Sequence, residues 1–332
     1  MILYVTDQGT GVYRRGERLQ VRRRKQVIAE VHLHDLEQVV LMGQIALSSP
    51  AMSTLLEQGV DTVFLSINGR YRGRLVGPAR RNVVLRQKQF KCYEDEPFRL
   101  NVARAVVEGK LRNMRTLIMR LARRRKVDVG TVAHRLRRSI QQVGRATNAE
   151  TLRGIEGAGT AAYFGVLGDF FPEGFAFKGR NRRPPRDPAN ALLSFGYALL
   201  GNSIEGAIYL VGLDPYLGFL HVVDYGRPSL ALDLMEEFRP VLVDALVLDL
   251  VNHNRVQSED FETRDGGVFL QGEGRKRLIE GYQRRLEDRV TYPVGGERVE
   301  RISYRRCLEY QVRRLARVIL GEEAQYRAFL VR

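Results

Sequence analysis

The sequence has no tryptophan and only two cysteines, Cys92 and Cys307, in 332 residues. Two distant cysteines without metal-type spacing exclude a disulfide framework and give no sign of a thiol active site. Histidines are also few, five in all, and a structural zinc site would need several of them or several cysteines.

Long hydrophobic runs are absent as well. No stretch approaches the roughly 20 apolar residues that cross a membrane. The first residues, Met1 to Asp7, lack the basic region and the long apolar stretch of a signal peptide. We therefore expect a cytoplasmic protein, and a chain of this length favours two domains, each with its own core.

Negative charge is in short supply. The chain has 54 Lys and Arg against 38 Asp and Glu, a formal net charge of +16. Such a field suits a polyanionic partner, and arginine presents a planar fork that fits phosphate. The surplus is concentrated between residues 97 and 150, which hold 14 Lys and Arg against three acidic residues. This favours nucleic-acid binding, although charge alone does not separate an enzyme from a scaffold.

Residues 1–85 are predicted to form a β-rich domain. Short segments rich in Val, Ile and Leu are separated by glycine-containing turns, which is typical of strands. Asn68-Gly69, between two such segments, is the preferred dipeptide of a type I′ hairpin turn. One helix is expected before Gly59, with Ser49 as its N-cap and Pro50 at its first position. The expected strands cover residues 2–5, 18–22, 27–33, 38–41, 62–67 and 71–76.

Residues 86–332 are predicted to form a mainly helical domain. Apolar residues recur every three or four positions from about residue 97 to 125, which indicates a long amphipathic helix. Residues 78–96 change composition and lose the strand pattern, so the domain boundary is expected there. A basic, proline-rich connection over residues 173–190 leads to a helix with Asp187 as N-cap and Pro188 at its first position. Further helices are expected over 240–251, 275–289 and 299–320, with a hairpin over 261–271.

The stretch from Gly218 to Pro240 carries the main candidates for chemistry. Asp233 and Glu236 are three residues apart, so on a helix they share one face. His221 precedes them in a loop with Gly226 and Pro228, which can bring its imidazole back toward the carboxylates. One nitrogen with carboxylate oxygens is a ligand set for Mg²⁺ or Mn²⁺. The same Asp-x-x-Glu spacing also fits a helix capping box, so the residues alone leave both interpretations open.

Glu156 is a further candidate because of its neighbours. It lies among Gly154, Gly157, Ala158 and Gly159, small residues that let a backbone or a ligand approach closely. Tight helix packing around an exposed glutamate explains the same pattern equally well. The basic connection over residues 173–190 is likewise either a phosphate-contacting segment or a solvated linker.

Four longer motifs, in order along the chain, resemble the CRISPR-associated protein one family, the endonuclease and integrase of spacer acquisition. The resemblance covers nearly the whole chain, and four long motifs in order are far more specific than a single one. The motifs are LRGIEGAGTAAYF (152–164), RPPRDPANALLSFGY (183–197), GLDPYLGFLH (212–221) and GRPSLALDLMEEFRP (226–240).

The resemblance implies a β-rich N-terminal domain used in dimerisation, joined to an all-helical catalytic domain that holds a divalent metal, Mg²⁺ or Mn²⁺. The family's metal ligands match Glu156, His221 and Glu236, and Asp233 matches a further acidic residue of the site. Many members have aspartate where this chain has Glu236. The resemblance also implies DNA as substrate, a homodimer, and a small ferredoxin-like partner subunit that bridges two dimers.

The implied reaction is attack by the 3′-hydroxyl of a short DNA fragment on a backbone phosphate at the edge of a repeat. With water as nucleophile the same site is an endonuclease. Two alternatives stay open: a structure-selective nuclease acting on branched DNA in repair, and a non-catalytic basic DNA-binding scaffold whose acidic residues are only caps and surface charges. The scaffold has no reason to bring Glu156, His221 and Glu236 together.

Overall fold

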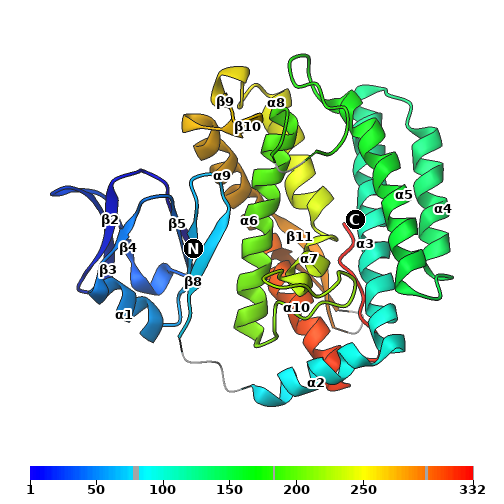
Figure 1. Ribbon diagram of the computed structural model, residues 1–332, viewed down its shortest axis with the longest axis horizontal. Helices are drawn as coiled ribbons and strands as arrows, with labels where there is room; N and C mark the ends of the chain where they lie inside the picture. Colours follow the sequence, from blue (N-terminus) through cyan, green and yellow to red (C-terminus); the bar gives the residue numbers. More distant parts are fainter. Residues whose placement is uncertain (78–81, 182–183, 296–297, 332) are drawn as a thin grey trace. The chain divides into compact units, whose positions relative to one another are not determined.

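The computed structural model describes residues 1–77, 82–181, 184–295 and 298–331. The chain forms two compact units, Met1–Arg81 and Asn82–Arg332 (Figure 1). The first is rich in strands and the second is mainly helical, so the predicted order of a β-rich part followed by a helical part is confirmed. None of the described helices combines the length and the apolar composition of a membrane span.

The predicted domain boundary, between residues 85 and 86, falls inside helix α2 (Val83–Glu94). The sequence analysis expected only a domain boundary within residues 78–96 and did not predict this helix. Asn82 caps it by accepting a hydrogen bond from the backbone N–H of Leu85. Only Leu85 and Gln89 of the helix are buried, so its sequence carries no apolar stripe from which periodicity could have revealed it.

The first unit contains two four-stranded sheets. Its strands are β1 (Ile2–Val5), β2 (Thr10–Arg15), β3 (Arg18–Arg23), β4 (Gln26–His32), β5 (Gln38–Met42), β6 (Ala46–Leu47), β7 (Asp61–Leu65) and β8 (Tyr71–Leu75), with a short 3-10 helix η1 (Leu33–Asp35). In the sheet of order β1-β5-β7-β8, the first three strands are parallel and β8 runs antiparallel to β7. In the sheet of order β4-β3-β2-β6, β2 to β4 form an antiparallel meander and β6 pairs in parallel with β2.

The core of the first unit is formed by both sheets and helix α1 (Ser49–Glu57). Val12, Leu19 and Val39 from the strands and Leu55 from the helix are fully buried in it. The N-cap of α1 is Ser48, which accepts from Ala51 N, and not Ser49 as predicted; Pro50 is consequently the second helical residue. Either serine can cap a helix, and the sequence pattern does not decide between adjacent candidates.

The turn at Asn68-Gly69 is not the predicted two-residue type I′ turn. Gly69 has a positive φ of 78°, but Asn68 is not among the described non-glycine residues of positive φ. Gly69 N donates to Ser66 O, and Ser66 N donates to Arg70 O, at 2.9 and 2.7 Å. This is a three-residue loop that ends in a left-handed glycine, and the register shift between Phe64 and Leu65 accommodates the extra residue.

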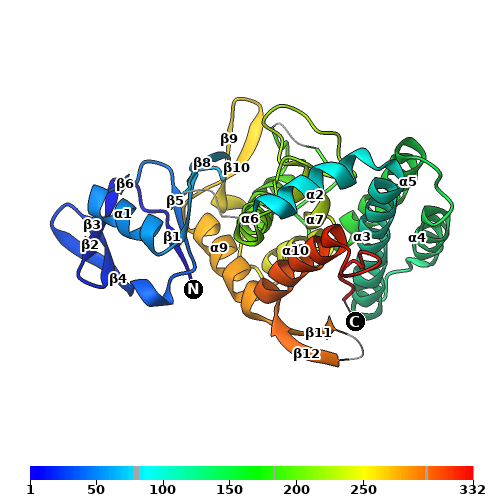
Figure 2. The ribbon, with the colours of Figure 1, turned by 90° about the horizontal axis from the view of Figure 1, so that it is seen from below.

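The second unit is built from α2 and a set of further helices. These are α3 (Glu96–Arg125), α4 (Gly130–Val143), α5 (Ala149–Leu167), η2 (Gly168–Phe170), α6 (Pro188–Val211), α7 (Ser229–Met235), the π-helix η3 (Arg239–Asp244), α8 (Ala245–Asn252), η4 (Ser258–Asp260), α9 (Gly272–Glu287) and α10 (Tyr304–Leu320). Helices α3, α4 and α5 lie side by side, and α6 packs against α10 (Figures 1 and 2). Asp187 caps α6 as predicted.

The second unit also contains two β-hairpins, so it is not all-helical. The first, β9 (Phe261–Arg264) with β10 (Gly267–Leu270), was predicted, and its two central residues, Asp265 and Gly266, have the positive φ that a type I′ turn requires. The second pairs β11 (Arg289–Gly295) with β12 (Arg298–Ser303). Residues 299–303 were predicted to be helical; they form β12 because they pair with β11 before Ser303 caps α10.

The last described residues return to helix α3. Gly321, with a φ of 84°, ends α10, and Tyr326 and Phe329 beyond it are buried. Asn113 of α3 donates its side-chain N–H to Phe329 O and accepts from Val331 N, at 2.8 and 3.0 Å. The end of the chain is thus part of the core of the second unit.

Candidate active site

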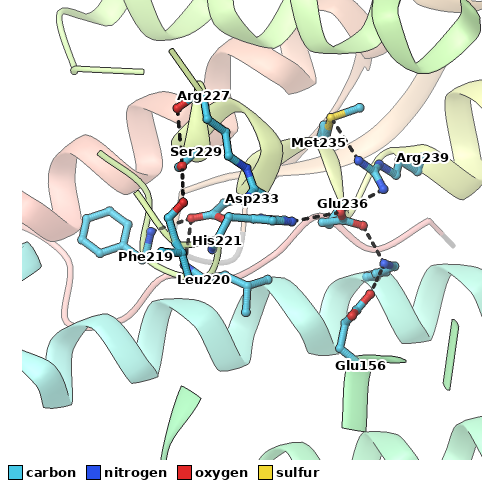
Figure 3. Close-up of polar contacts among 12 residues, drawn as sticks. Glu156, Phe219, Leu220, His221, Arg227, Ser229, Asp233, Met235, Glu236 and Arg239 are labelled. Atoms are coloured by element: carbon cyan, nitrogen blue, oxygen red, sulfur yellow. Dashed lines mark hydrogen bonds and ion pairs between the residues drawn. The ribbon is translucent and has the colours of Figure 1, made fainter. Parts of the chain in front are cut away.

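Three of the predicted site residues meet in the second unit (Figure 3). Glu156 lies in the middle of α5, His221 lies in the loop before α7, and Glu236 is the residue that ends α7. Glu156 and Glu236 both contact the ammonium group of Lys110, and His221 Nε2 lies 3.9 Å from Glu236 Oε1. Side chains separated by up to eighty positions in the sequence therefore share one small volume.

Lys110 is a site residue that the sequence analysis did not single out. It lies on α3, its side chain is only 4% exposed, and its Nζ is 2.8 Å from Glu236 Oε2. The same Nζ donates a hydrogen bond to Glu156 Oε1, which also accepts from Thr160 Oγ1 at 3.0 Å. The sequence offers one signal that could have identified Lys110: it lies next to the apolar stripe of α3, and a buried lysine needs a carboxylate partner.

Glu236 is held as an anion. Its side chain is 4% exposed, and Arg239 Nη1 lies 3.0 Å from its Oε1. Burial alone would raise the pKa of Glu236, but the Arg239 guanidinium and the Lys110 ammonium outweigh burial and lower that pKa to about 2. The carboxylate is consequently ionised at every pH at which the protein would work.

Asp233 is placed differently from Glu236 (Figure 3). One carboxylate oxygen accepts from the backbone N–H groups of Phe219 and Leu220, and the other accepts from His221 N at 2.9 Å and contacts His221 Nδ1 at 2.7 Å. Because an ionised carboxylate only accepts, Nδ1 carries the proton of this contact, and Nε2 is the ring nitrogen that faces Glu236. Asp233 therefore shapes the loop and orients the imidazole.

The capping-box interpretation of Asp233 and Glu236 is wrong. The residue at the N-cap of α7 is Pro228, and Asp233 lies inside the helix near its end. Ser229 anchors the loop instead, since its hydroxyl donates to Val222 O at 2.9 Å. Gly218 permits the close approach of this loop, because a Cβ there would lie 2.7 Å from the backbone carbon of Ser229 and 2.8 Å from Asp233 Oδ2.

The oxygen and nitrogen atoms of Glu156, Glu236 and His221 suit a hard divalent cation, provided that the Lys110 ammonium between the two glutamates moves. Among the described residues, no three His, Cys, Asp or Glu side chains are close enough, as they stand, to hold a metal ion. A cation nevertheless lies between Glu156 and Glu236, namely the Lys110 ammonium. Glu236 Oε2 is buried and receives no well-aligned hydrogen bond, so its contact with Nζ is an ion pair without the hydrogen bond. A buried carboxylate oxygen without a hydrogen bond is chemically suited to a metal.

Asp244 is another buried carboxylate, and it is linked to the site through Tyr197 and Arg239. It accepts hydrogen bonds from Tyr163 on α5 and Tyr197 on α6, at 2.7 and 2.5 Å. Burial raises the pKa of Asp244 to about 6, although the two hydroxyl donors act against this. The Tyr197 ring lies against the guanidinium groups of Arg180 and Arg239, 5.2 and 4.9 Å from its centroid. Arg239 thereby connects this network to Glu236.

Glu237, next to Glu236 in sequence, faces the other way and holds the end of the chain. Its carboxylate accepts hydrogen bonds from Tyr326 Oη at 2.6 Å, from Gln311 Nε2 at 3.1 Å and from the backbone N–H of Phe329. Burial raises the pKa of Glu237 to about 7 against the effect of these donors. The Phe329 ring also stacks on Phe238, with 5.0 Å between ring centroids.

The basic residues of α3 and α4 surround a hollow of about 570 Å³. Arg112, Arg115 and Arg137 line it together with Ile140 and the end of the chain. Arg112 is paired with Glu108 at 2.6 Å, whereas Arg115 donates to the backbone oxygen of Ala133. Part of the positive surplus between residues 97 and 150 is thus gathered on one face of the helical unit.

The basic connection before α6 is tied down by side-chain hydrogen bonds where the structure describes it. Arg180 donates to Asn190 Oδ1 at 2.5 Å, and Asn181 Nδ2 donates to Asp187 Oδ2 at 2.8 Å. Asn190, in the first turn of α6, donates in turn to Gly179 O and to Asp187. Arg182 and Arg183, two cations of this connection, lie outside the described residues, so the choice between a phosphate-contacting segment and a solvated linker stays open for them.

Comparison with known proteins gives the family. The family model for CRISPR associated protein Cas1 matches residues 3–284. A curated relative from Thermus thermophilus, named CRISPR-associated endonuclease Cas1 3, is 38% identical over 333 residues, which cover all of this chain and 97% of the relative.

Solved structures agree. A CAS1 protein from Thermotoga maritima is 26% identical with a TM-score of 0.82, over 96% of this chain and 97% of that chain. A chain of a Cas6-RT-Cas1–Cas2 complex is 26% identical with a TM-score of 0.83, over 99% of this chain and 36% of that chain. Since the family model covers most of the chain and the relative matches over its full length, this protein belongs to the CRISPR associated protein Cas1 family of endonucleases.

Proposed function

We propose that this protein is a metal-dependent DNA endonuclease and integrase that inserts short DNA fragments into a CRISPR array. The observation that carries the proposal is the meeting of Glu156 and Glu236 at one buried cation, with His221 beside Glu236, in a strongly basic protein. A DNA-binding scaffold has no reason to gather two carboxylates, a lysine and a histidine in one largely buried volume, because removing charged groups from water costs stability.

Glu156, Glu236 and His221 Nε2 are the groups that would hold the divalent ion, Mg²⁺ or Mn²⁺. The ion would supply positive charge to polarise the phosphoryl oxygens and to stabilise the leaving 3′ oxygen. The low pKa of Glu236, about 2, keeps this ligand anionic without any metal present. The bond between Asp233 and His221 Nδ1 fixes the ring so that Nε2 is the free nitrogen, the usual arrangement of a carboxylate behind a metal-binding histidine.

The chain's other residues would hold the substrate. In strand transfer, the 3′-hydroxyl oxygen of the fragment forms a bond to phosphorus while the bond from phosphorus to the 3′ oxygen of the target strand breaks. One proton leaves the attacking hydroxyl and one joins the leaving oxygen, so one phosphodiester replaces another and no energy source is needed. Arg239, beside Glu236, is placed to neutralise a phosphate, and the arginines around α3 and α4 would hold the DNA backbone without reading bases.

We further propose a homodimer that acts with a small ferredoxin-like partner bridging two dimers. The sequence motifs support this by their resemblance to the family, and one structural relative is a chain of a complex that contains both Cas1 and Cas2. The N-terminal β-rich unit is the proposed dimerisation domain, and the cytoplasm is the proposed location.

The test is an integration assay with purified protein. A plasmid that carries a CRISPR repeat is mixed with short DNA duplexes and Mg²⁺ or Mn²⁺, and joined products are counted. Glu156→Gln should reduce joining and strand cleavage at least about a hundredfold, because losing about 3 kcal/mol of transition-state stabilisation has that effect. DNA binding, measured in parallel, should change little.

Glu150→Gln is the matched control, since Glu150 is an exposed residue in the first turn of the same helix. It removes the same charge from α5 and should join fragments as the wild type does. Equal joining by Glu156→Gln and the wild type would end the proposal and leave a basic DNA-binding protein. Cleavage of branched DNA without any joining to the repeat would favour the repair nuclease instead.

A further inference from the structure

Lys110 is a fixed positive charge at the position where the proposed function needs a metal ion. Its ammonium contacts Glu156 Oε1 and lies 2.8 Å from Glu236 Oε2, and its side chain is only 4% exposed. It is therefore not a surface lysine that happens to lie near an acidic cluster. A divalent ion that takes oxygens from both glutamates must first move this ammonium aside.

The two glutamates of the site already have cationic partners without a metal. Two carboxylates, Glu156 and Glu236, face two cations, Lys110 and Arg239. The remaining carboxylate, Asp233, is satisfied by backbone N–H groups and by His221 Nδ1. With His221 as a neutral ligand, the three carboxylates and the two cations sum to −1, so a divalent ion would leave one excess positive charge in a largely buried volume, which is unfavourable.

If a metal ion displaced it, the Lys110 ammonium would stay close to that ion. Lys110 lies on α3 among residues packed in the core, including Asn113, which is held by the backbone oxygens of Glu237 and Phe329. The Lys110 side chain is only 4% exposed, so a displaced ammonium would stay in a largely buried volume. It needs an anion within the site, and a DNA phosphate bound to the metal is such an anion.

We propose that Lys110 makes metal binding depend on DNA. In the free protein the ammonium substitutes for the metal ion, keeps the two glutamates in position and weakens metal binding. When a phosphate of the substrate enters, it supplies the missing negative charge, accepts a hydrogen bond from the displaced ammonium, and allows the metal to bind. This inference rests on the proposed function of the site and adds a coupling between its two ligands. By reciprocity, the metal tightens DNA binding by the same factor.

The experiment measures Mn²⁺ binding to the full-length protein, with the free ion quantified by electron paramagnetic resonance. Titrations are run without DNA and with a saturating short duplex, for the wild type, Lys110→Met and Lys110→Arg. Lys110→Met removes the charge and retains an unbranched side chain, and Lys110→Arg retains the charge. Glu236→Gln with the same duplex is the blank for Mn²⁺ bound by the DNA alone.

In the wild type, DNA should tighten Mn²⁺ binding at least about tenfold, the lower part of the usual range for coupled sites. Lys110→Met should bind Mn²⁺ without DNA at least about tenfold more tightly than the wild type, and DNA should add little. Lys110→Arg should keep the wild-type dependence. Thermal melting without DNA gives a second readout: Mn²⁺ should raise the Tm of Lys110→Met more than that of the wild type.

The inference is overturned if wild-type Mn²⁺ affinity is the same with and without DNA, or if folded Lys110→Met binds Mn²⁺ no more tightly than the wild type. The wild-type comparison decides even if the methionine variant does not fold. Failure of the proposed function looks different: the wild type would then bind no Mn²⁺ above the blank under either condition.

Discussion

Glu237 offers a direct test of how burial and hydrogen bonding shape this site. We consider the substitution Glu237→Gln, which keeps the size of the side chain and removes its charge. The carboxylate is completely buried and accepts hydrogen bonds from Tyr326, Gln311 and Phe329 N. Because burial raises its pKa from 4.5 to about 7, the folded protein binds this proton more tightly than the unfolded chain does.

The sign of the pH dependence follows from this difference. Below about pH 4.5 the residue is protonated in both states, and its contribution to stability is fully present. Between pH 4.5 and about 7 only the folded state holds the proton, so the free energy of unfolding falls as pH rises. The loss amounts to about 3 kcal/mol, the free energy that corresponds to the displacement of the pKa.

Glutamine cannot titrate, so Glu237→Gln should lack this component. Its own loss of hydrogen bonding, about 1 to 3 kcal/mol, is independent of pH. The Tm of the wild type minus that of the variant should therefore be larger at pH 5 than at pH 8, by roughly 6 to 12 °C on the usual scale for domains of this size. Differential scanning calorimetry at several pH values measures it.

Glu280→Gln is the control, because Glu280 is an exposed residue of α9 and loses the same charge. Its Tm difference from the wild type should be small at every pH. A Tm difference for Glu237→Gln that does not change between pH 5 and pH 8 would refute the reasoning. It would mean that the hydrogen bonds from the end of the chain keep the pKa of Glu237 near its ordinary value.

Two further predictions concern the loop that carries His221. Gly218→Ala should lower the free energy of unfolding by about 1 to 3 kcal/mol, since the added Cβ would meet the backbone of Ser229 at 2.7 Å; urea denaturation measures this, and unchanged stability would show that the loop adjusts freely. Asp233→Asn should reduce strand joining more than it reduces stability, because one amide cannot accept from both the loop N–H groups and His221 Nδ1. Nitrogen NMR of the histidine ring should then show loss of the single Nδ1–H tautomer, and an unaltered tautomer would contradict the orienting role.

Much of the local structure could be predicted because local patterns determine it. The positive φ values of Asp265 and Gly266 follow from the Asp-Gly pair between two strand-like segments. Asp187 and Pro188 mark the start of α6 for equally local reasons. Asn68-Gly69 carries the same kind of signal, yet the chain there forms a three-residue loop, because the register of β7 and β8 fixes the turn.

The hairpin β11–β12 and helix α2 were missed for a different reason. Residues 299–303 precede a strongly amphipathic helix without a proline or glycine to separate them, and their strand conformation depends on pairing with β11. Helix α2 has little apolar periodicity because only two of its residues, Leu85 and Gln89, are buried, and one of them is polar. The sequence pattern within each segment therefore does not predict its secondary structure.

By itself, the sequence determined the class of fold, the basic character of the helical unit and the types of side chain available for chemistry, because these follow from composition, periodicity and local motifs. It also supplied Glu156, His221 and Glu236 through motifs that resemble a known family. Only the tertiary structure decided that Lys110 lies between the two glutamates and that Asp233 holds the histidine loop. The physical reason is that electrostatic contacts depend on distances of a few ångströms between helices, and the packing of α3, α5 and α7 sets those distances.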